Sequence, residues 1–290
     1  MTLLTVDVGN SQTVLATFDG PRRRDCWRVT TAPKATADEL RMLWRGLLRD
    51  TTVTGVAVCS AVPALLPALR QLLDSLEVPV VLIGPGVRTG VPLHVDNPRE
   101  VGADRVVTAL AAHEMFGRRP DGSGRPVVVV DFGTSTNVDA VGPDGQFLGG
   151  ALAPGVEVSH DALASRAAQL RSVELTVPAH AIGKNTVAAL QSGLVLGFAG
   201  LVDGLVGRIA AELVAQFGTA PVVVATGGLA PLLAARGQRV AWLTGSQKKK
   251  ARGEMLAMIG AGEAALVVGT HAVIQEQVTF ERLGLAVRAL

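Results

Sequence analysis

A strand that runs into an aspartate and a glycine turn is the feature that most constrains this chain. The stretch Val127–Asp139 reads VVVVDFGTSTNVD. Its four consecutive β-branched residues predict a buried strand, with Asp131 at the end and Gly133 breaking the pattern. A glycine turn rich in hydroxyls and amides, beside a carboxylate, suits a phosphate or a hydrated cation, because the backbone can approach closely and donate hydrogen bonds. Taken alone, the same residues also fit an ordinary tight hairpin.

A second copy of this pattern opens the chain, where Leu4–Val14 reads LTVDVGNSQTV. An alignment without gaps pairs Asp7 with Asp131, Gly9 with Gly133, Ser11 with Ser135 and Val14 with Val138. Two such hairpins at the starts of two similar halves indicate an internal duplication, with two unrelated hairpins as the alternative. Duplicated halves of this kind resemble the sugar-kinase, heat-shock-protein and actin superfamily. That resemblance implies an α/β protein of two ribonuclease-H-like domains, whose opening hairpins clamp ATP.

Length and composition agree with two soluble domains. The chain has 290 residues, 48% of them apolar but only 3% aromatic, so its cores must be built from Val, Leu, Ala and Ile. A net charge of +2 is too small to indicate binding to nucleic acid or to an anionic membrane. The longest apolar run, Leu194–Val206, is interrupted by Asp203 and by glycines, so no membrane span is expected.

The expected location is the cytoplasm. The first strand starts almost at Met1, which leaves no room for a signal peptide. Cys26 and Cys59 form neither a disulfide framework nor a metal-ligand spacing, which fits a reducing compartment. Each cysteine is expected to be a small core residue rather than a nucleophile.

Strand and helix patterns alternate after the first hairpin, which predicts an α/β domain with a mixed sheet. The basic run Arg22–Arg24 is interpreted as a solvated loop. In the second half, one helix is expected from Thr186 to about Phe217, with bends at its glycines. The predicted domains are residues 1–120, 121–236 and a separate tail at 237–290.

The segment Pro98–Phe116 carries the next candidate site. Gly102 and Ala103 open a predicted helix, and Asp104 and Arg105 lie in its first turn. An aspartate there can simply satisfy free amides and the helix dipole. An adjacent arginine is less well explained, because basic residues prefer the other helix end. Together the two side chains could offer a carboxylate base and a cationic clamp to one small substrate.

With these motifs in place, residues 1–236 resemble the type III pantothenate kinases. The shared motifs, in order, are DVGNS at Asp7–Ser11, GADR at Gly102–Arg105, DFGTST at Asp131–Thr136, GGALAPG at Gly149–Gly155, Asn185-Thr186 and TGG at Thr226–Gly228. The resemblance implies ATP-dependent phosphorylation of pantothenate, the first step of coenzyme A synthesis. It also implies a homodimer.

The resemblance further implies residue roles. Asp104 would be the catalytic base, Arg105 would bind the substrate carboxylate, and Thr186 would reach pantothenate across the dimer interface. Asp131 would bind a monovalent cation, potassium or ammonium, while magnesium would accompany ATP. Pantothenate would be held by Gly102, Ala103, Asp104, Arg105 and Thr186. ATP would be contacted by Asp7, Val8, Gly9, Asn10, Ser11, Gln12, Thr13, Val14 and Thr134.

Two positions depart from the family pattern. Ser11 stands where the family usually has threonine, which keeps the hydroxyl. An aromatic residue usually precedes GADR in the substrate pocket, and here that place falls on Val95. Val95 in place of an aromatic residue would affect the affinity for the substrate rather than the phosphoryl transfer itself.

The tail, residues 237–290, resembles a piece of the motor domain of RecG-type ATP-dependent DNA helicases. The matching stretches are WLTGS, KKKAR and GTHAVIQEQVTFERLGL, but no G-x-x-x-x-G-K-[ST] loop occurs anywhere in the chain, so helicase chemistry is not expected. Val240–Leu243 and Ala264–Val268 are predicted strands and Glu254–Ile259 a predicted helix. The tail is apolar and could cover the surface that the family's own ending would cover, but its strands come from another sheet and have no evolved partner here, so we expect residues 237–290 to pack loosely against the second domain.

The sequence therefore predicts a two-domain kinase with a foreign tail that binds no nucleic acid. Two alternatives remain at this point. The first is a non-enzymatic regulatory accessory factor of the same fold. The second is a catalytically impaired kinase whose replaced tail no longer supports the adenosine side.

Overall fold

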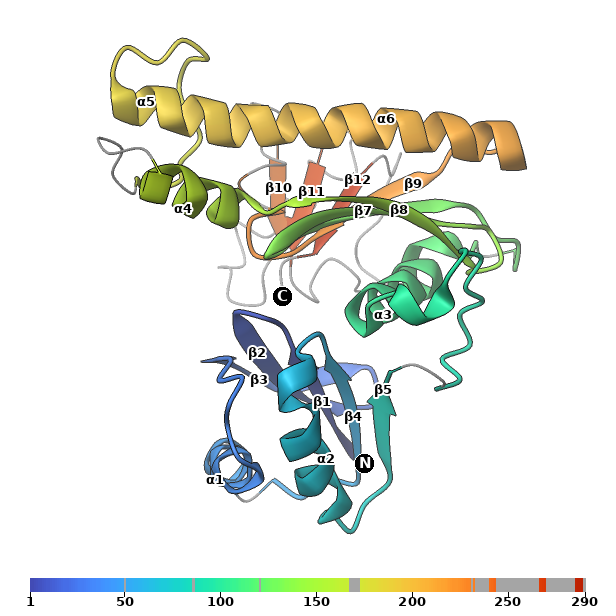
Figure 1. The fold of residues 1–290 in the computed structure, drawn as a ribbon. Coiled ribbons are helices and arrows are strands. Elements are labelled where there is room, and N and C mark those ends of the chain that lie inside the picture. Colours follow the sequence, from blue (N-terminus) through green and yellow to red (C-terminus); the bar gives the residue numbers. More distant parts are fainter. Residues whose placement is uncertain are drawn as a thin grey trace. The chain divides into compact units, whose positions relative to one another are not determined.

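The computed structural model describes residues 1–49, 51–84, 87–119, 121–166, 173–230 and 232, together with three strands at 240–243, 266–269 and 285–288. The chain divides into two compact units (Figure 1). The first unit comprises Met1–Val91 and Asp96–Thr108, and the second comprises Pro92–Val95 and Ala109–Leu290. Helix α3 (Ala103–Ala112) crosses this division. The domain limits expected at residues 120 and 236 stay predictions.

The first unit is built on a five-stranded sheet in the order β3-β2-β1-β4-β5. The strands β1 (Thr2–Val8), β2 (Gln12–Asp19) and β3 (Arg22–Thr30) form an antiparallel meander. The strands β4 (Gly55–Ser60) and β5 (Val80–Ile83) run parallel to β1. A short 3-10 turn (Pro63–Leu65) leads into helix α2 (Leu66–Asp74). The core contains side chains of β1, β4 and the helices.

Helix α1 (Ala37–Leu48) begins at a capping box. The Thr36 side chain accepts a hydrogen bond from the Glu39 amide, and the Thr36 amide donates to Glu39 Oε2 over 2.7 Å. One face of the helix, with Leu40 and Trp44, is buried in the first core. The amphipathic spacing that predicted this helix is therefore what attaches it to the sheet.

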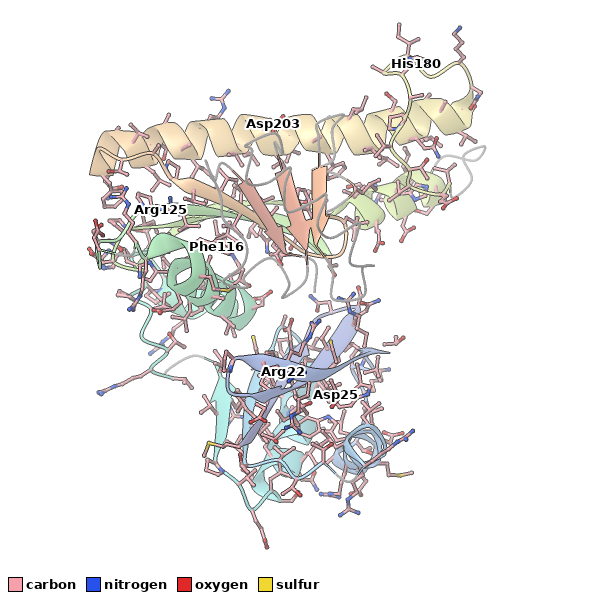
Figure 2. The ribbon with its side chains drawn as sticks, turned by 180° about the vertical axis from the view of Figure 1, so that it is seen from behind. Arg22, Asp25, Phe116, Arg125, His180 and Asp203 are labelled. Atoms are coloured by element: carbon pink, nitrogen blue, oxygen red, sulfur yellow. The ribbon has the colours of Figure 1, made fainter. Side chains whose placement is uncertain are left out.

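The basic run Arg22–Arg24 lies in strand β3, so the expected loop is wrong, whereas Arg22 and Arg24 are exposed to solvent as expected. This strand is the edge of its sheet, and Figure 2 shows Arg22 and Asp25 upon it. Arg24 pairs with Asp19 on β2 at 2.7 Å, and the Asp25 amide donates to the Thr17 hydroxyl over 3.2 Å. Charged residues are common on edge strands because they oppose pairing with other chains.

The second unit repeats this arrangement. Its meander is β6 (Val127–Phe132), β7 (Ser135–Val141) and β8 (Phe147–Pro154), and β9 (Val222–Thr226) runs parallel to β6. The four valines Val127–Val130 are at most 2% exposed. The order β8-β7-β6-β9-β12 matches β3-β2-β1-β4-β5 strand for strand. The predicted α/β fold with duplicated halves is thereby confirmed.

A continuous helical segment covers one face of the second sheet (Figure 1). It consists of α5 (Thr186–Gln191), a π-helical turn (Ser192–Leu196) and α6 (Gly197–Phe217), and α4 (Val156–Arg166) lies nearby. The π-helical turn, which contains Gly193, is an irregularity of this segment, and bends at its other glycines stay a prediction. Helix α6 ends at Gly218, whose φ of 68° allows its amide to donate to the Val214 carbonyl.

This segment is also apolar. By length and composition alone, Thr186–Phe217 could cross a membrane, with a mean hydropathy of 1.7, and 22% of its most apolar window is buried. A helix in the core of a soluble protein passes the same test, and Val195, Val202 and Leu213 do pack in the second core. The expected absence of a membrane span stays a prediction.

Three strands of the tail join the second sheet. The strands are β10 (Val240–Leu243), β11 (Leu266–Gly269) and β12 (Leu285–Arg288). β10 pairs with β11, β11 with β12 and β12 with β9, all in parallel. The strand predicted at Val240–Leu243 is confirmed, and β11 begins two residues after the predicted Ala264. The predicted helix Glu254–Ile259 lies outside the described residues.

Candidate active site

The turn of the first hairpin is held by Thr31, which follows strand β3. The Gly9 amide donates to the Gln12 carbonyl over 3.0 Å. The Thr31 hydroxyl donates to the Gly9 carbonyl over 2.7 Å, and the Thr31 amide donates to the Ser11 carbonyl over 3.0 Å. Asn10, Ser11 and Gln12 are exposed at this turn. The turn is thus fixed in shape while its outer groups remain accessible.

Two of the eight predicted ATP contacts on this hairpin have side chains that face the interior. Val8 is 1% exposed and Thr13 is 8% exposed. The Thr13 hydroxyl lies 2.9 Å from the Thr31 hydroxyl, which ties strand β2 to the same clamp. Any contact that Val8 and Thr13 make with a phosphate would therefore come from the main chain.

Asp7 and Asp104 belong to the same unit although they are far apart in sequence. Asp7 is the last but one residue of β1, and Asp104 is in the first turn of α3. Loss of hydration raises the pKa of the Asp7 carboxyl, and the negative charge of Asp104 raises it further. More than a third of the Asp7 surface is nevertheless exposed, so its carboxylate remains accessible to a bound cation.

Gly102 determines where the Asp104 carboxylate lies. A Cβ atom at position 102 would clash with Oδ1 of Asp104, so the carboxylate lies against the Gly102 Cα. Gly102 is also the residue before the first helical position, and its carbonyl accepts from the Val106 amide. The predicted helix start at Gly102-Ala103 is confirmed.

Cys59 belongs to this cluster, although sequence reasoning treated it as a core residue only. It is the register partner of Asp7 in the parallel pair β1–β4 and is 7% exposed. Burial raises the pKa of the Cys59 thiol to about 12, and the carboxylates of Asp7 and Asp104 add to that shift. The thiol is therefore neutral and unreactive at physiological pH. The position of Cys59 near the end of a predicted strand is the sequence feature that could have placed it beside Asp7.

The second hairpin has the same outline with a tighter turn. The Gly133 amide donates to the Ser135 carbonyl over 3.0 Å. Asp131 pairs with Asn137, whereas Asp7 pairs with Val14, so the ungapped sequence alignment slips by one residue beyond the turn. A Cβ at Gly133 would lie 3.8 Å from Oδ1 of Asp131, which places this carboxylate beside the turn. Thr134 is exposed at the turn itself.

Glycines bring other segments of the second unit against this hairpin. A Cβ at Gly155 would clash with the Thr134 carbonyl, and one at Gly227 would clash with the Phe132 carbonyl. Gly227 also has a φ of 93°, which other residues rarely adopt. Gly155 and Gly227, one from each of the GGALAPG and TGG motifs, thus have a structural reason, which is close packing around the end of β6 and its turn.

Two further predicted positions lie in the second unit. Thr186 is exposed at the first position of α5, where the Asn185 side chain caps the helix by accepting from the Ala188 amide over 2.9 Å. Val95 lies beside β8, because the His94 amide donates to the Phe147 carbonyl over 2.9 Å and a Cβ at Gly149 would be 3.8 Å from Val95. Asn185 therefore has a structural role, and Thr186 is left available at the surface.

The donor set is suited to hard cations rather than transition metals. Within the part of the chain that the structure describes, no group of three or more His, Cys, Asp and Glu residues could hold a metal ion. What the hairpins offer instead is carboxylate, hydroxyl and carbonyl oxygen, as hard cations prefer. In the first unit Asp7, Gly102 and Asp104 are brought together, and Arg105 follows directly on α3. In the second unit Asp131 and Thr134 share one turn.

Comparison with known proteins gives one family. A family model described as type III pantothenate kinase matches residues 3–208. Proteins named type III pantothenate kinase from a Parafrankia species and from Frankia alni are each 56% identical over 233 residues. These matches cover 80% of this chain and 88% and 89% of the relatives. Among solved structures, the ROK hexokinase from Thermus thermophilus is 16% identical with a TM-score of 0.47, covering 100% of this chain and 93% of that one.

Proposed function

This chain belongs to the type III pantothenate kinase family, and from that premise we propose how its residues carry out the reaction. The activity is transfer of a phosphoryl group from ATP to pantothenate, in the first step of coenzyme A synthesis. ATP acts with a divalent cation. The observation that carries our assignment is that Asp7, near the end of β1, and Asp104, in the first turn of α3, belong to one unit, where the charge of Asp104 raises the pKa of Asp7.

In this proposal Asp104 is the catalytic base. It accepts the proton of the primary hydroxyl of pantothenate as that oxygen attacks the γ-phosphorus, and the bond to the bridging oxygen of ADP breaks. Arg105 binds the carboxylate of pantothenate, with Gly102 and Ala103 bordering the substrate. The burial and charge that raise the pKa of Asp7 also support a cation site, because two close carboxylates are stabilised by a cation near them.

The first hairpin, Asp7–Val14, contacts the ATP phosphates in this proposal. Its exposed turn offers amides and the Ser11 hydroxyl, and Asp7 would hold the divalent ion that accompanies ATP. Thr134 would contact ATP from the second hairpin. Positioning and neutralisation of oxygen charge are the main contributions that such a site makes to phosphoryl transfer.

We further propose that Asp131 binds a monovalent cation, potassium or ammonium, and that the protein is a homodimer. The second proposal is supported by the long helical segment Thr186–Phe217, because only 22% of its most apolar window is buried. Exposed apolar surface of this kind favours association with another protein surface. Thr186 of one protomer would then complete the pantothenate site of the other. A cytoplasmic location, with no membrane or nucleic-acid partner, completes the proposal.

A turnover assay on the purified full chain tests this function against its two alternatives. With ATP, magnesium, potassium and pantothenate, we expect ADP and 4′-phosphopantothenate to form in equal amounts by mass spectrometry. Calorimetric binding of pantothenate without turnover would indicate a catalytically impaired kinase. Neither binding nor turnover would indicate an accessory factor of the same fold.

A further inference from the structure

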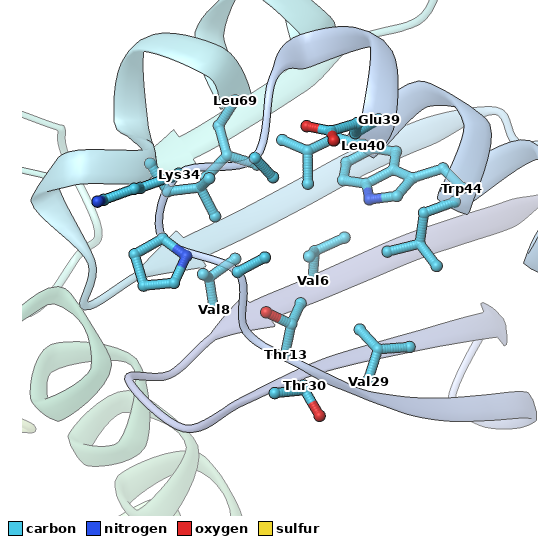
Figure 3. Close-up of a pocket in the computed structure, with 15 residues that line it drawn as sticks. Val6, Val8, Thr13, Val29, Thr30, Lys34, Glu39, Leu40, Trp44 and Leu69 are labelled. Carbon is cyan, nitrogen blue, oxygen red and sulfur yellow. The ribbon is translucent and has the colours of Figure 1, made fainter.

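The first unit contains a cavity on the helix-covered face of its sheet. Its volume is about 570 Å³, which falls in the range of small-molecule sites. Its walls are apolar side chains from the sheet and from α1 and α2, among them Val6, Leu40, Trp44 and Leu69 (Figure 3). Apolar cavities take up apolar ligands.

The mouth of the cavity lies at the connection between β3 and α1. Ala32, Pro33 and Lys34 line it there and are exposed, whereas the floor residues Val6 and Leu69 are at most 2% exposed. Lys34 is the cation at this rim, and its amine extends outward in Figure 3. Glu39, the lining carboxylate, is engaged in the cap of α1 through the Thr36 amide and hydroxyl. The rim therefore presents a positive charge above an apolar interior.

The same connection also holds the first hairpin. Thr13 lines the cavity, and its hydroxyl lies 2.9 Å from that of Thr31. Thr31 in turn hydrogen-bonds the Gly9 and Ser11 carbonyls at the turn. A ligand that moves the segment Thr30–Ala35 would therefore move a residue that holds the turn in place.

We propose that this cavity binds an amphiphilic monoanion, with its unbranched apolar chain against the partly exposed lining side chains Val29, Ala35 and Leu43 and its acidic group beside Lys34. Binding shifts Thr31 and thereby changes the affinity of the first hairpin for ATP. The binding half of the proposal stands by itself. The coupling half rests on the proposed function, because it assumes that the hairpin contacts the ATP phosphates.

Binding is tested with decanoate on the full chain, followed by tryptophan fluorescence and by calorimetry. Because Trp44 lines the cavity, we expect a saturable fluorescence change that Trp44→Phe removes while the heat of binding remains. Ala35→Phe should block binding, and Ala32→Phe at the exposed rim does the same without touching the core. Circular dichroism checks that each variant is folded.

The contact between Lys34 and the acidic group is tested with a variant that lacks the charge of Lys34 and with an uncharged ligand. Lys34→Gln should weaken decanoate binding by about two- to fivefold, as expected for an exposed ion pair, and should leave the binding of decanol unchanged. Arg45→Gln, an exposed basic residue on α1 outside the cavity, is the matched control and should change neither. Absence of saturable binding, or equal binding by Ala32→Phe and the unmodified chain, would overturn the proposal.

Coupling is tested by amide hydrogen exchange at Gly9 and Ser11 and by the KM for ATP. Saturating decanoate should change exchange at both amides and shift the KM for ATP by about fivefold, a typical coupling strength. Thr31→Val removes the hydroxyl bond to the Gly9 carbonyl but keeps the amide bond to the Ser11 carbonyl, so it should keep decanoate binding, lose the effect at Gly9 and reduce the shift in KM. Unchanged exchange with decanoate bound would overturn the coupling. Changed exchange in a protein without kinase activity would instead count against the proposed function alone.

Discussion

At the scale of single residues, the chemistry depends on a few carboxylates placed by backbone constraints. Asp7 and Asp104 come from the end of a strand and the start of a helix, and Gly102 leaves room for the second of them. Burial raises the pKa of the Asp7 carboxyl, and the negative charge of Asp104 raises it further. Repulsion between two carboxylates lowers the free energy of unfolding of the protein. Such a cost in stability is common at functional sites.

Replacement of the proposed base should reduce turnover more than binding. Asp104→Asn keeps the shape of the side chain but cannot accept the hydroxyl proton, so we expect kcat to fall by about two to four orders of magnitude. Calorimetry should still detect pantothenate binding. Asp74→Asn, an exposed aspartate at the end of α2, is the control and should have normal kinetics. Near-normal turnover of Asp104→Asn would show that Asp104 is not the catalytic base.

Because of Asp7, the free energy of unfolding should decrease as pH rises above the pKa of an unfolded aspartate. Its pKa in the folded state is raised above 3.8, so the folded protein holds this proton more tightly than the unfolded chain. Stability is then lost as pH rises from the unfolded to the folded pKa. Asp7→Asn should therefore be more stable than the unmodified chain at neutral pH, and this advantage should shrink near about pH 4, as measured by urea unfolding.

Asp19 provides a control with the opposite sign. A hydrogen bond from Arg24 is the main cause that lowers the pKa of this exposed carboxyl. Its stabilising contribution is present above the unfolded pKa and is lost as pH falls through the folded one. Asp19→Asn should thus be no more stable than the unmodified chain at neutral pH. A stabilised Asp19→Asn, or a destabilised Asp7→Asn, would contradict this account.

Asp131 should make turnover selective for monovalent cations. We expect the rate to rise with potassium or ammonium and to stay low in sodium at the same ionic strength. Asp131→Asn should lose most of this selectivity, because it removes the charge that holds the ion beside the turn. Steady-state rates in chloride salts of the three ions measure it. A rate indifferent to the ion in the unmodified chain would show that the proposed role of Asp131 is wrong.

At the scale of elements, the sequence patterns predicted helix α1 and the buried strand β6 but did not predict the edge strand β3. The capped helix α1 and the buried strand β6 follow directly from their sequences. Strand β3 does not, because three consecutive arginines are typical of loops, and it is pairing with β2 that makes them a strand. The long helical segment from Thr186 also exposes apolar side chains that suggest a partner.

Disturbing the start of that segment should affect the substrate site if a partner completes it. Thr186→Arg should raise the KM for pantothenate while the KM for ATP changes little, because residue 186 would contact pantothenate and not ATP. Gln216→Arg, near the other end of the same segment, introduces the same charge as a control. Sedimentation of the unmodified chain should give a dimer. A fully active monomer at assay concentration would rule out the shared site.

At the scale of the whole molecule, two units repeat one sheet topology, and the second is completed by the tail. Strand β12 pairs with β9 at the position that β5 occupies in the first unit. The expectation that the tail could patch the gap agrees with this pairing, and its loose packing stays a prediction. Without the tail β9 would be the edge of the sheet, and the unpaired amides and carbonyls of an edge can pair with another strand.

Removing the tail should weaken the second unit without improving catalysis. Deletion of residues 237–290 exposes the edge of β9 and any apolar surface covered there, at about 25 cal/mol for each Å². We expect a lower melting temperature and no gain in turnover, whereas grafting a family-like ending should increase activity. Limited proteolysis of the full chain should cut first near Gly245–Gly253, which lies outside the described residues. Equal protease resistance of tail and core, in a fully active enzyme, would show that the tail has become an integral part of the fold.

The sequence alone determined the repeated hairpins, the two α/β halves and the family. Those features depend on local patterns: β-branched runs, glycine turns and short motifs such as GADR. The slip of one residue between the hairpins depends instead on the number of residues in each turn, which pairing decides. Only the tertiary structure put Cys59 and Asp104 beside Asp7, made Arg22–Arg24 a strand and gave the tail strands a partner. These outcomes depend on contacts between residues far apart in the chain, and no local pattern encodes which edge or strand end such a residue will meet.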